Sequence, residues 1–142
     1  MPRWDPDDKE RTALHEAGHA VVGWSCGAIV GCIHLDTEKQ GGSAHMTFAE
    51  HFSTVEEIAY WLAGYEAEQM LKPPGSKRRA MVDVGETDRI LRENEAGEEL
   101  REQGRECART RLREHESKLR VVVSHLVQYN YMDRVTFQAM MQ

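Results

Sequence analysis

The chain has 142 residues, enough for one domain that buries about two thirds of its unfolded surface without disulfides. Its net charge is −6, and residues 1–71 alone carry 12 acids against 4 bases, which argues against a nucleic-acid partner and favours neutral or cationic substrates. The three cysteines form no CxxC pair, so we expect free thiols. The sequence has no long apolar run and no signal-peptide core, so we expect a cytoplasmic protein without a membrane span.

The first predicted element is a helix that starts after Asp5. Asp5 is a good N-cap, Pro6 suits the first helical position, and Gly27 offers a C-terminal stop. Apolar residues then recur at helical spacing and predict a packed face: Leu14, Ala17, Val21 and Trp24.

This helix carries the pattern HExxH at residues 15–19. On a helix, His15 and His19 share one face, so both imidazoles can hold one ion while Glu16 lies a step around the cylinder, beside an open coordination position. The pattern is typical of zinc metallopeptidases. The alternative is a buried helix with two incidental histidines.

A zinc site that works on a carbonyl needs a third protein ligand, which this motif does not identify. No histidine stands six residues after His19. The residues alone leave five candidates open: Glu66, Glu68, Asp83, Glu86 and Asp88.

Apolar and polar residues alternate within residues 28–49, and turn-forming residues lie in the middle of this segment. The pattern predicts two strands of a small two- to three-stranded sheet. An edge strand beside the HExxH helix can hold an extended peptide by backbone hydrogen bonds. A purely structural hairpin is the alternative.

Helices are predicted for most of the remaining chain. Ser53 and Glu56 form a capping box that starts a core helix, and residues 72–85 follow as a basic loop, in which Lys77, Arg78 and Arg79 are either solvated or steer an acidic partner. Residues 87–142 predict C-terminal helices, interrupted at Gly97 and Gly104, with Asp133 capping the last. We therefore expect an α+β, mostly helical fold in a single domain over residues 1–142.

Four segments resemble the peptidase domain of FtsH-type ATP-dependent zinc metalloproteases. "ALHEAGHAVVG" matches the family's HEAGHA block, "LAGYEAEQML" its LFGGRAAEEL helix, and "VGETDRIL" its GASNDIERA segment. "LREHESKLRVVVSHLVQYNYMDRVTFQAM" is similar to its C-terminal region. The chain departs from the second block at Tyr65, Glu66, Gln69 and Met70, which leaves Glu66 and Glu68 without counterparts. It also has no GxxxxGK[ST] phosphate loop and no apolar run long enough for a transmembrane helix, so we expect neither the family's motor nor its membrane anchor in these residues.

The resemblance implies a zinc metalloendopeptidase that cleaves peptides or unfolded proteins. It implies that Asp88 is the third Zn²⁺ ligand beside His15 and His19, and Glu16 would act as the general base. A separate unfoldase or adaptor would deliver folded substrates, and a homo-oligomer, as in the family, stays open. One alternative is a non-catalytic zinc-containing module that binds peptides or proteins. Another is a structural zinc, although His34, His45 and His51 show no ligand spacing that supports it.

Overall fold

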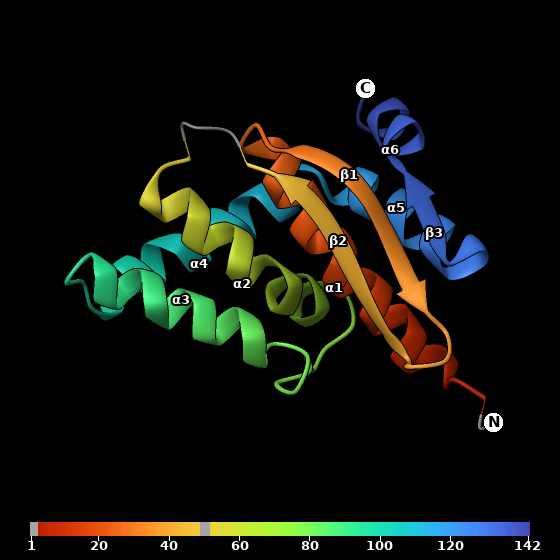
Figure 1. Cartoon of the computed structure of the whole chain (residues 1–142), viewed down its shortest axis with the longest axis horizontal. Coiled ribbons are helices and arrows are strands. Elements are labelled where there is room, and N and C mark those ends of the chain that lie inside the picture. Colours follow the sequence, from red (N-terminus) through yellow and green to blue (C-terminus); the bar gives the residue numbers. More distant parts are fainter. Residues whose placement is uncertain (1–2, 49–51) are drawn as a thin grey trace.

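The computed structural model describes residues 3–48 and 52–142 of the chain. Within them the elements run in the order α1 (Pro6–Ser25), β1 (Ile29–Asp36), β2 (Gly41–Thr47), α2 (Thr54–Leu71), α3 (Met81–Glu93), α4 (Glu98–Glu114), α5 (Glu116–Tyr129), β3 (Tyr131–Asp133) and α6 (Arg134–Met141) (Figure 1). This arrangement confirms the predicted α+β, mostly helical class. None of the described helices is both long enough and apolar enough to cross a membrane.

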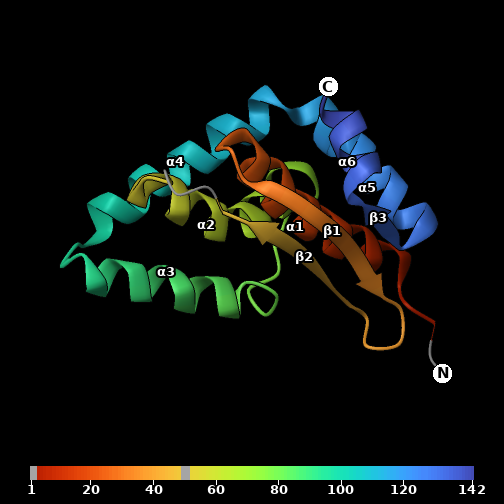
Figure 2. The same ribbon diagram turned by 45° about the horizontal axis from the view of Figure 1, so that its top comes forward.

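Helix α1 lies at the centre of the molecule. Every residue from 12 to 23 is buried, because the sheet covers one side of the helix, α2 packs on a second and α5 on a third (Figures 1 and 2). The predicted start is confirmed, since the Asp5 carboxylate accepts hydrogen bonds from the backbone N–H groups of Asp7 and Asp8. Such complete burial holds the side chains of α1 in fixed positions.

The sheet has the strand order β2-β1-β3, and both pairings are antiparallel. The predicted hairpin is present as β1 and β2, while Ala49, the last residue of the predicted strand region, lies outside the described residues. Strand β3 interrupts the C-terminal helices that the sequence predicts. It was missed because it is only three residues long and is defined by its pairing with β1, as at Ile33 and Met132.

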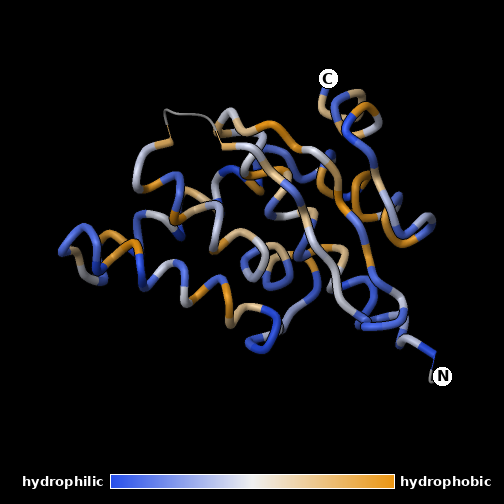
Figure 3. Tube along the Cα trace, viewed as in Figure 1, coloured by the Kyte–Doolittle hydropathy of each residue, from blue (hydrophilic) through white to orange (hydrophobic). Residues whose placement is uncertain are grey.

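The segment between α2 and α3 corrects one predicted boundary. The capping box of Ser53 and Glu56 is confirmed. The loop expected over residues 72–85 ends earlier, because α3 already begins at Met81. The first turn of α3 exposes Met81 and Val82, so its sequence lacks the half-buried pattern that predicts a helix. Figure 3 shows this apolar start of α3 directly after the hydrophilic loop.

The C-terminal segment forms two helices, α4 and α5, which meet at His115, where the chain changes direction (Figure 2). The predicted interruption at Gly104 is wrong. Gly104 lies inside α4, where a Cβ atom would overlap the side chain of Ile58 on α2. The glycine therefore allows two helices to approach closely rather than ending one. Asp133 caps α6 as predicted.

Candidate metal centre

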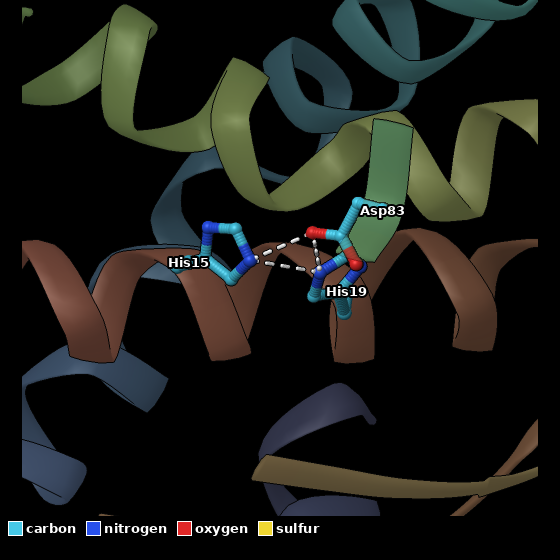
Figure 4. Close-up of side chains that lie close together, drawn as sticks. All are labelled: His15, His19 and Asp83. Atoms are coloured by element: carbon cyan, nitrogen blue, oxygen red, sulfur yellow. Dashed lines mark hydrogen bonds and ion pairs between the residues drawn. The ribbon is translucent and has the colours of Figure 1, made fainter. Parts of the chain in front are cut away.

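Three side chains from two helices converge on one point. His15 and His19 of α1 and Asp83 of α3 point toward one another (Figure 4). Oδ2 of Asp83 lies 2.9 Å from Nε2 of His15 and 3.1 Å from Nε2 of His19, and the two Nε2 atoms are 3.1 Å apart. All three residues are buried. The two histidines thus lie on one face of α1, as the spacing of the motif predicts.

The other ring nitrogens are held by acceptors. Nδ1 of His19 lies 2.8 Å from the backbone carbonyl oxygen of Tyr60, so this nitrogen carries a proton and donates it. Nδ1 of His15 lies 2.8 Å from Oε2 of Glu68 and donates likewise. In the neutral rings both Nε2 atoms are therefore unprotonated, and their lone pairs face Asp83. An acceptor behind each imidazole is the usual support of a metal-binding histidine.

Glu68 is itself held firmly. Its side chain is completely buried and accepts hydrogen bonds from the Arg79 guanidinium, at 2.8 Å from Nη2, and from the backbone N–H of Ser76. Burial alone would raise the pKa of Glu68, but hydrogen bonds from His15 and Arg79 keep it below its ordinary value. Glu68 stays anionic and fixes the ring orientation of His15.

Three lone-pair atoms so close together repel one another unless positive charge lies between them. The pKa values of His15 and Asp83 show the same preference for positive charge. Burial opposes the protonated form of His15, yet the hydrogen bonds to Asp83 and Glu68 outweigh burial and raise its pKa from 6.5 to about 9. Burial likewise opposes the charged form of Asp83, but both histidines hold its pKa at about 2. A cation among these three atoms, either a proton or a metal ion, would relieve the repulsion.

The donor set fits zinc. Two imidazole nitrogens and one carboxylate oxygen are common ligands of a catalytic zinc site, where tetrahedral donors at 2.0–2.1 Å from the ion stand about 3.3 Å apart. The observed separations are a few tenths of an ångström shorter. In residues 3–48 and 52–142 no fourth histidine, cysteine, aspartate or glutamate joins the cluster. Three protein ligands are the usual set of a catalytic zinc site, in which water or substrate takes the fourth position.

Glu16 follows His15 on α1 and is 9% exposed. Throughout the described part of the chain, no group forms a hydrogen bond or ion pair with its carboxylate. Its side chain passes beneath β2, because a Cβ atom built on Gly42 would lie 2.9 Å from Cγ of Glu16. An unpaired carboxylate beside the histidines, next to an edge strand, is available to accept a proton.

Asp88, the third ligand that the resemblance implies, is not brought to the histidines. Its Oδ1 accepts a hydrogen bond from Nη2 of Arg101 at 2.7 Å. Asp83 stands five residues earlier, about 140° around the helix. The structure therefore brings Asp83, and not Asp88, to the two histidines. Asp83 is one of the five candidates that the residues left open.

A signal for Asp83 was present in the sequence. The other buried residues of α3 are Thr87, Ile90 and Leu91, which lie four, seven and eight positions after Asp83 and so on the same helix face. Asp88 is off that face. Extending the apolar stripe backward across the expected loop would have selected Asp83.

The other candidate acids have different partners. Glu66 is bound by Nε of Arg109 at 2.7 Å, and Glu86 by Nε of Arg89 at 2.9 Å. Nδ1 of His34 lies 2.8 Å from the hydroxyl of Ser43 on β2, away from the cluster, and the rings of His34 and His45 stack. His51 lies outside the described residues.

Close packing of α2 against α1 also shapes the site. Gly64 of α2 faces the ring of His15, and a Cβ atom there would lie 2.6 Å from Nε2 of that ring. A glycine is required at this position because the imidazole occupies the space of a side chain. The segment that contributes Gly64 is the one that resembles the LFGGRAAEEL helix.

Comparison with protein-family models gives no match, and neither does comparison with curated proteins. The candidate site therefore rests on the geometry of its own residues.

Proposed function

We propose that this chain is a zinc-dependent metalloendopeptidase, with His15, His19 and Asp83 as the zinc ligands and Glu16 as the general base. The observation that carries the proposal is the convergence of three donor atoms from α1 and α3 beside the unpaired carboxylate of Glu16 on α1. The resemblance to FtsH-type peptidase domains points to the same chemistry, with Asp83 in the place that it assigns to Asp88.

When bound, zinc would supply Lewis acidity for polarising a carbonyl and activating water. The protein residues do the rest. Glu16 takes the proton of the attacking water and passes it to the leaving amine. Glu68 and the Tyr60 carbonyl hold the two imidazoles in the orientation that directs both Nε2 atoms inward.

Strand β2 suits an extended substrate. Within the described residues it pairs only with β1, so its other side is a sheet edge whose backbone groups can bind a peptide as an added strand. Glu16 lies directly beneath this strand at Gly42. The substrate class is therefore a peptide or an unfolded polypeptide, since a folded protein must first unfold locally to present such a strand.

The test combines metal analysis with peptide digestion. Purified protein should hold about one zinc per chain, in line with the single such cluster among the described residues. Glu16→Gln should keep the zinc and lose hydrolysis by about 10²- to 10⁴-fold, because an amide cannot accept the proton. Glu10→Gln makes the same change on the same helix, at a residue that pairs with Lys72, and should keep full activity. Equal activity of Glu16→Gln and wild type would overturn the mechanism.

A non-catalytic binding module is the second candidate, and one observation favours it. The four residues of the site are only 3–9% exposed, which leaves little access for a substrate carbonyl. Zinc-loaded wild type that binds an unfolded polypeptide without cleaving it would decide for this candidate.

A further inference from the structure

A cleft of about 610 Å³ lies between α2, α3 and α4. Its volume is typical of a site for a small molecule or a short peptide segment. Asp83 is among its lining residues, so the cleft borders the candidate metal centre. Helices α3 and α4 meet at the turn around residues 94–97 and separate toward this centre (Figure 2).

One wall of the cleft is apolar and aromatic. Trp61, Leu62 and Tyr65 contribute it from α2, and Met81 and Val84 from the first turns of α3. Met81 is 70% exposed and Val84 42%, so their apolar surface is accessible to a ligand. This wall can bury an apolar or aromatic side chain of a bound segment.

The opposite wall is cationic. Arg101, Arg105 and Arg109 are spaced four residues apart on α4, so they share one face, and all three line the cleft together with Lys77. The acids among the lining residues are Glu66 and Asp83. Since Asp83 is engaged by the histidines, the cleft has an excess of positive charge, although the whole chain has a net charge of −6.

The present partners of these cations leave capacity for another carboxylate. Arg105 pairs with Glu102 on its own helix, an exposed pairing that contributes little. The other acid that it meets among the described residues, Glu66, is 3.9 Å away and hydrogen-bonded to Arg109. Nowhere in the described chain does Lys77 find a hydrogen bond or an ion pair. Arg105 and Lys77 can therefore meet a ligand carboxylate without giving up a strong interaction.

We propose that this cleft is a substrate-selecting subsite that takes a carboxylate next to an apolar side chain, with Arg105 and Lys77 on the carboxylate and the α2 wall against the apolar group. The inference rests on the proposed function, because it places the subsite on one side of the bond to be cleaved. The carboxylate comes either from an Asp or Glu side chain or from the C-terminus of the substrate.

The experiment uses three peptides with one shared apolar core. The first has Glu beside the core and an amidated C-terminus, the second has Gln and a free C-terminal carboxylate, and the third has Gln and an amidated C-terminus. Dissociation constants are measured by calorimetry on zinc-loaded Glu16→Gln protein, so that binding is separated from turnover. Values of kcat/KM are measured on the wild type.

At least one carboxylate-bearing peptide should bind about three- to tenfold more tightly than the third peptide, and the one that gains identifies the source of the carboxylate. Arg105→Gln combined with Lys77→Gln should remove this preference. Lys77→Gln alone, at an exposed residue that has no hydrogen bond or ion pair in the described part of the chain, should reduce it and keep the fold. Arg120→Gln is the matched control, because this exposed arginine pairs with Glu116 on α5 and does not line the cleft.

Equal binding of the three peptides would overturn the subsite, as would a preference that survives in the double variant. Cleavage of all three peptides at equal rates overturns the subsite and leaves the peptidase proposal standing. A binding preference without any cleavage by zinc-loaded wild type would support the subsite and overturn the peptidase proposal.

Discussion

Helix α1 and helix α3 supply the candidate ligands from very different settings. In α1 every residue from 12 to 23 is buried, whereas α3 buries only Asp83, Thr87, Ile90 and Leu91. The apolar side of α3 packs on a small cluster with Ile58 and Leu62 of α2, separate from the main core. Two ligands are thus fixed by the core, while the third lies on a peripheral helix.

This difference teaches how metal binding and folding are linked in this protein. Local opening costs least where few apolar contacts hold an element, so α3 is easier to release than α1. A metal ion that bridges Asp83 to the histidines would join the two helices and stabilise the closed form. The predictions below address this comparison.

The largest effect is expected from loss of the ligand on α3. Asp83→Ala should reduce the zinc content from about one per chain to nearly none, because two imidazoles alone hold the ion weakly. Asp88→Ala on the same helix should retain zinc, since Asp88 bonds to Arg101 instead. Metal analysis after dialysis measures both variants. Retention by Asp83→Ala, with loss by Asp88→Ala, would return the third ligand to the position implied by the resemblance.

Removal of zinc by a chelator should loosen α3 selectively. If zinc is present at a hundred times its dissociation constant, its removal costs about 2.7 kcal/mol, or about 100-fold in the opening equilibrium. Amide hydrogen exchange of α3 should accelerate by up to this factor, while residues 15–23 of α1 stay protected. Restored protection after zinc is added back is the control. Equal acceleration in both helices would show that they form one cooperative unit.

Glu68→Gln should weaken zinc binding about tenfold without abolishing it. The amide keeps the shape of the side chain but loses the charge that orients His15 through Nδ1. Glu66→Gln is a suitable control, because this neighbouring buried acid bonds to Arg109 and not to a histidine. Competition with a chelating dye measures the affinities. Equal affinities of the two variants would exclude an orienting role for Glu68.

The smallest effects come from alanine at one glycine of each helix. Gly18→Ala in α1 should destabilise the fold by about 1 kcal/mol, because the new Cβ atom would lie 2.7 Å from the Ala63 carbonyl oxygen and overpacking outweighs the gain in helix propensity. Gly85→Ala in α3 should instead stabilise it by about 0.5–1 kcal/mol, since nothing lies within 4 Å of its new Cβ atom. Denaturant unfolding measures both, and shifts of the same sign would contradict the difference in packing.

Local sequence signals determined much of the fold. Asp5 and Pro6 fixed the start of α1, Ser53 and Glu56 the start of α2, and Asp133 the start of α6, because a cap depends only on residues within one turn. The hairpin followed from alternation around a polar turn. The pairing of His15 with His19 was equally local, since helical spacing alone places both rings on one face.

Contacts between distant segments decided the rest. The first turn of α3 exposes Met81 and Val82, β3 exists through its pairing with β1, and Gly104 faces Ile58 across a helix pair. None of the three has a strong local signature. The choice of Asp83 over Asp88 is of the same kind. Both are helical acids in one segment, and only the side of α3 that packs on α2 determines which carboxylate reaches the histidines. A sequence motif can specify a ligand pair on one helix, but the third ligand depends on how a second helix packs.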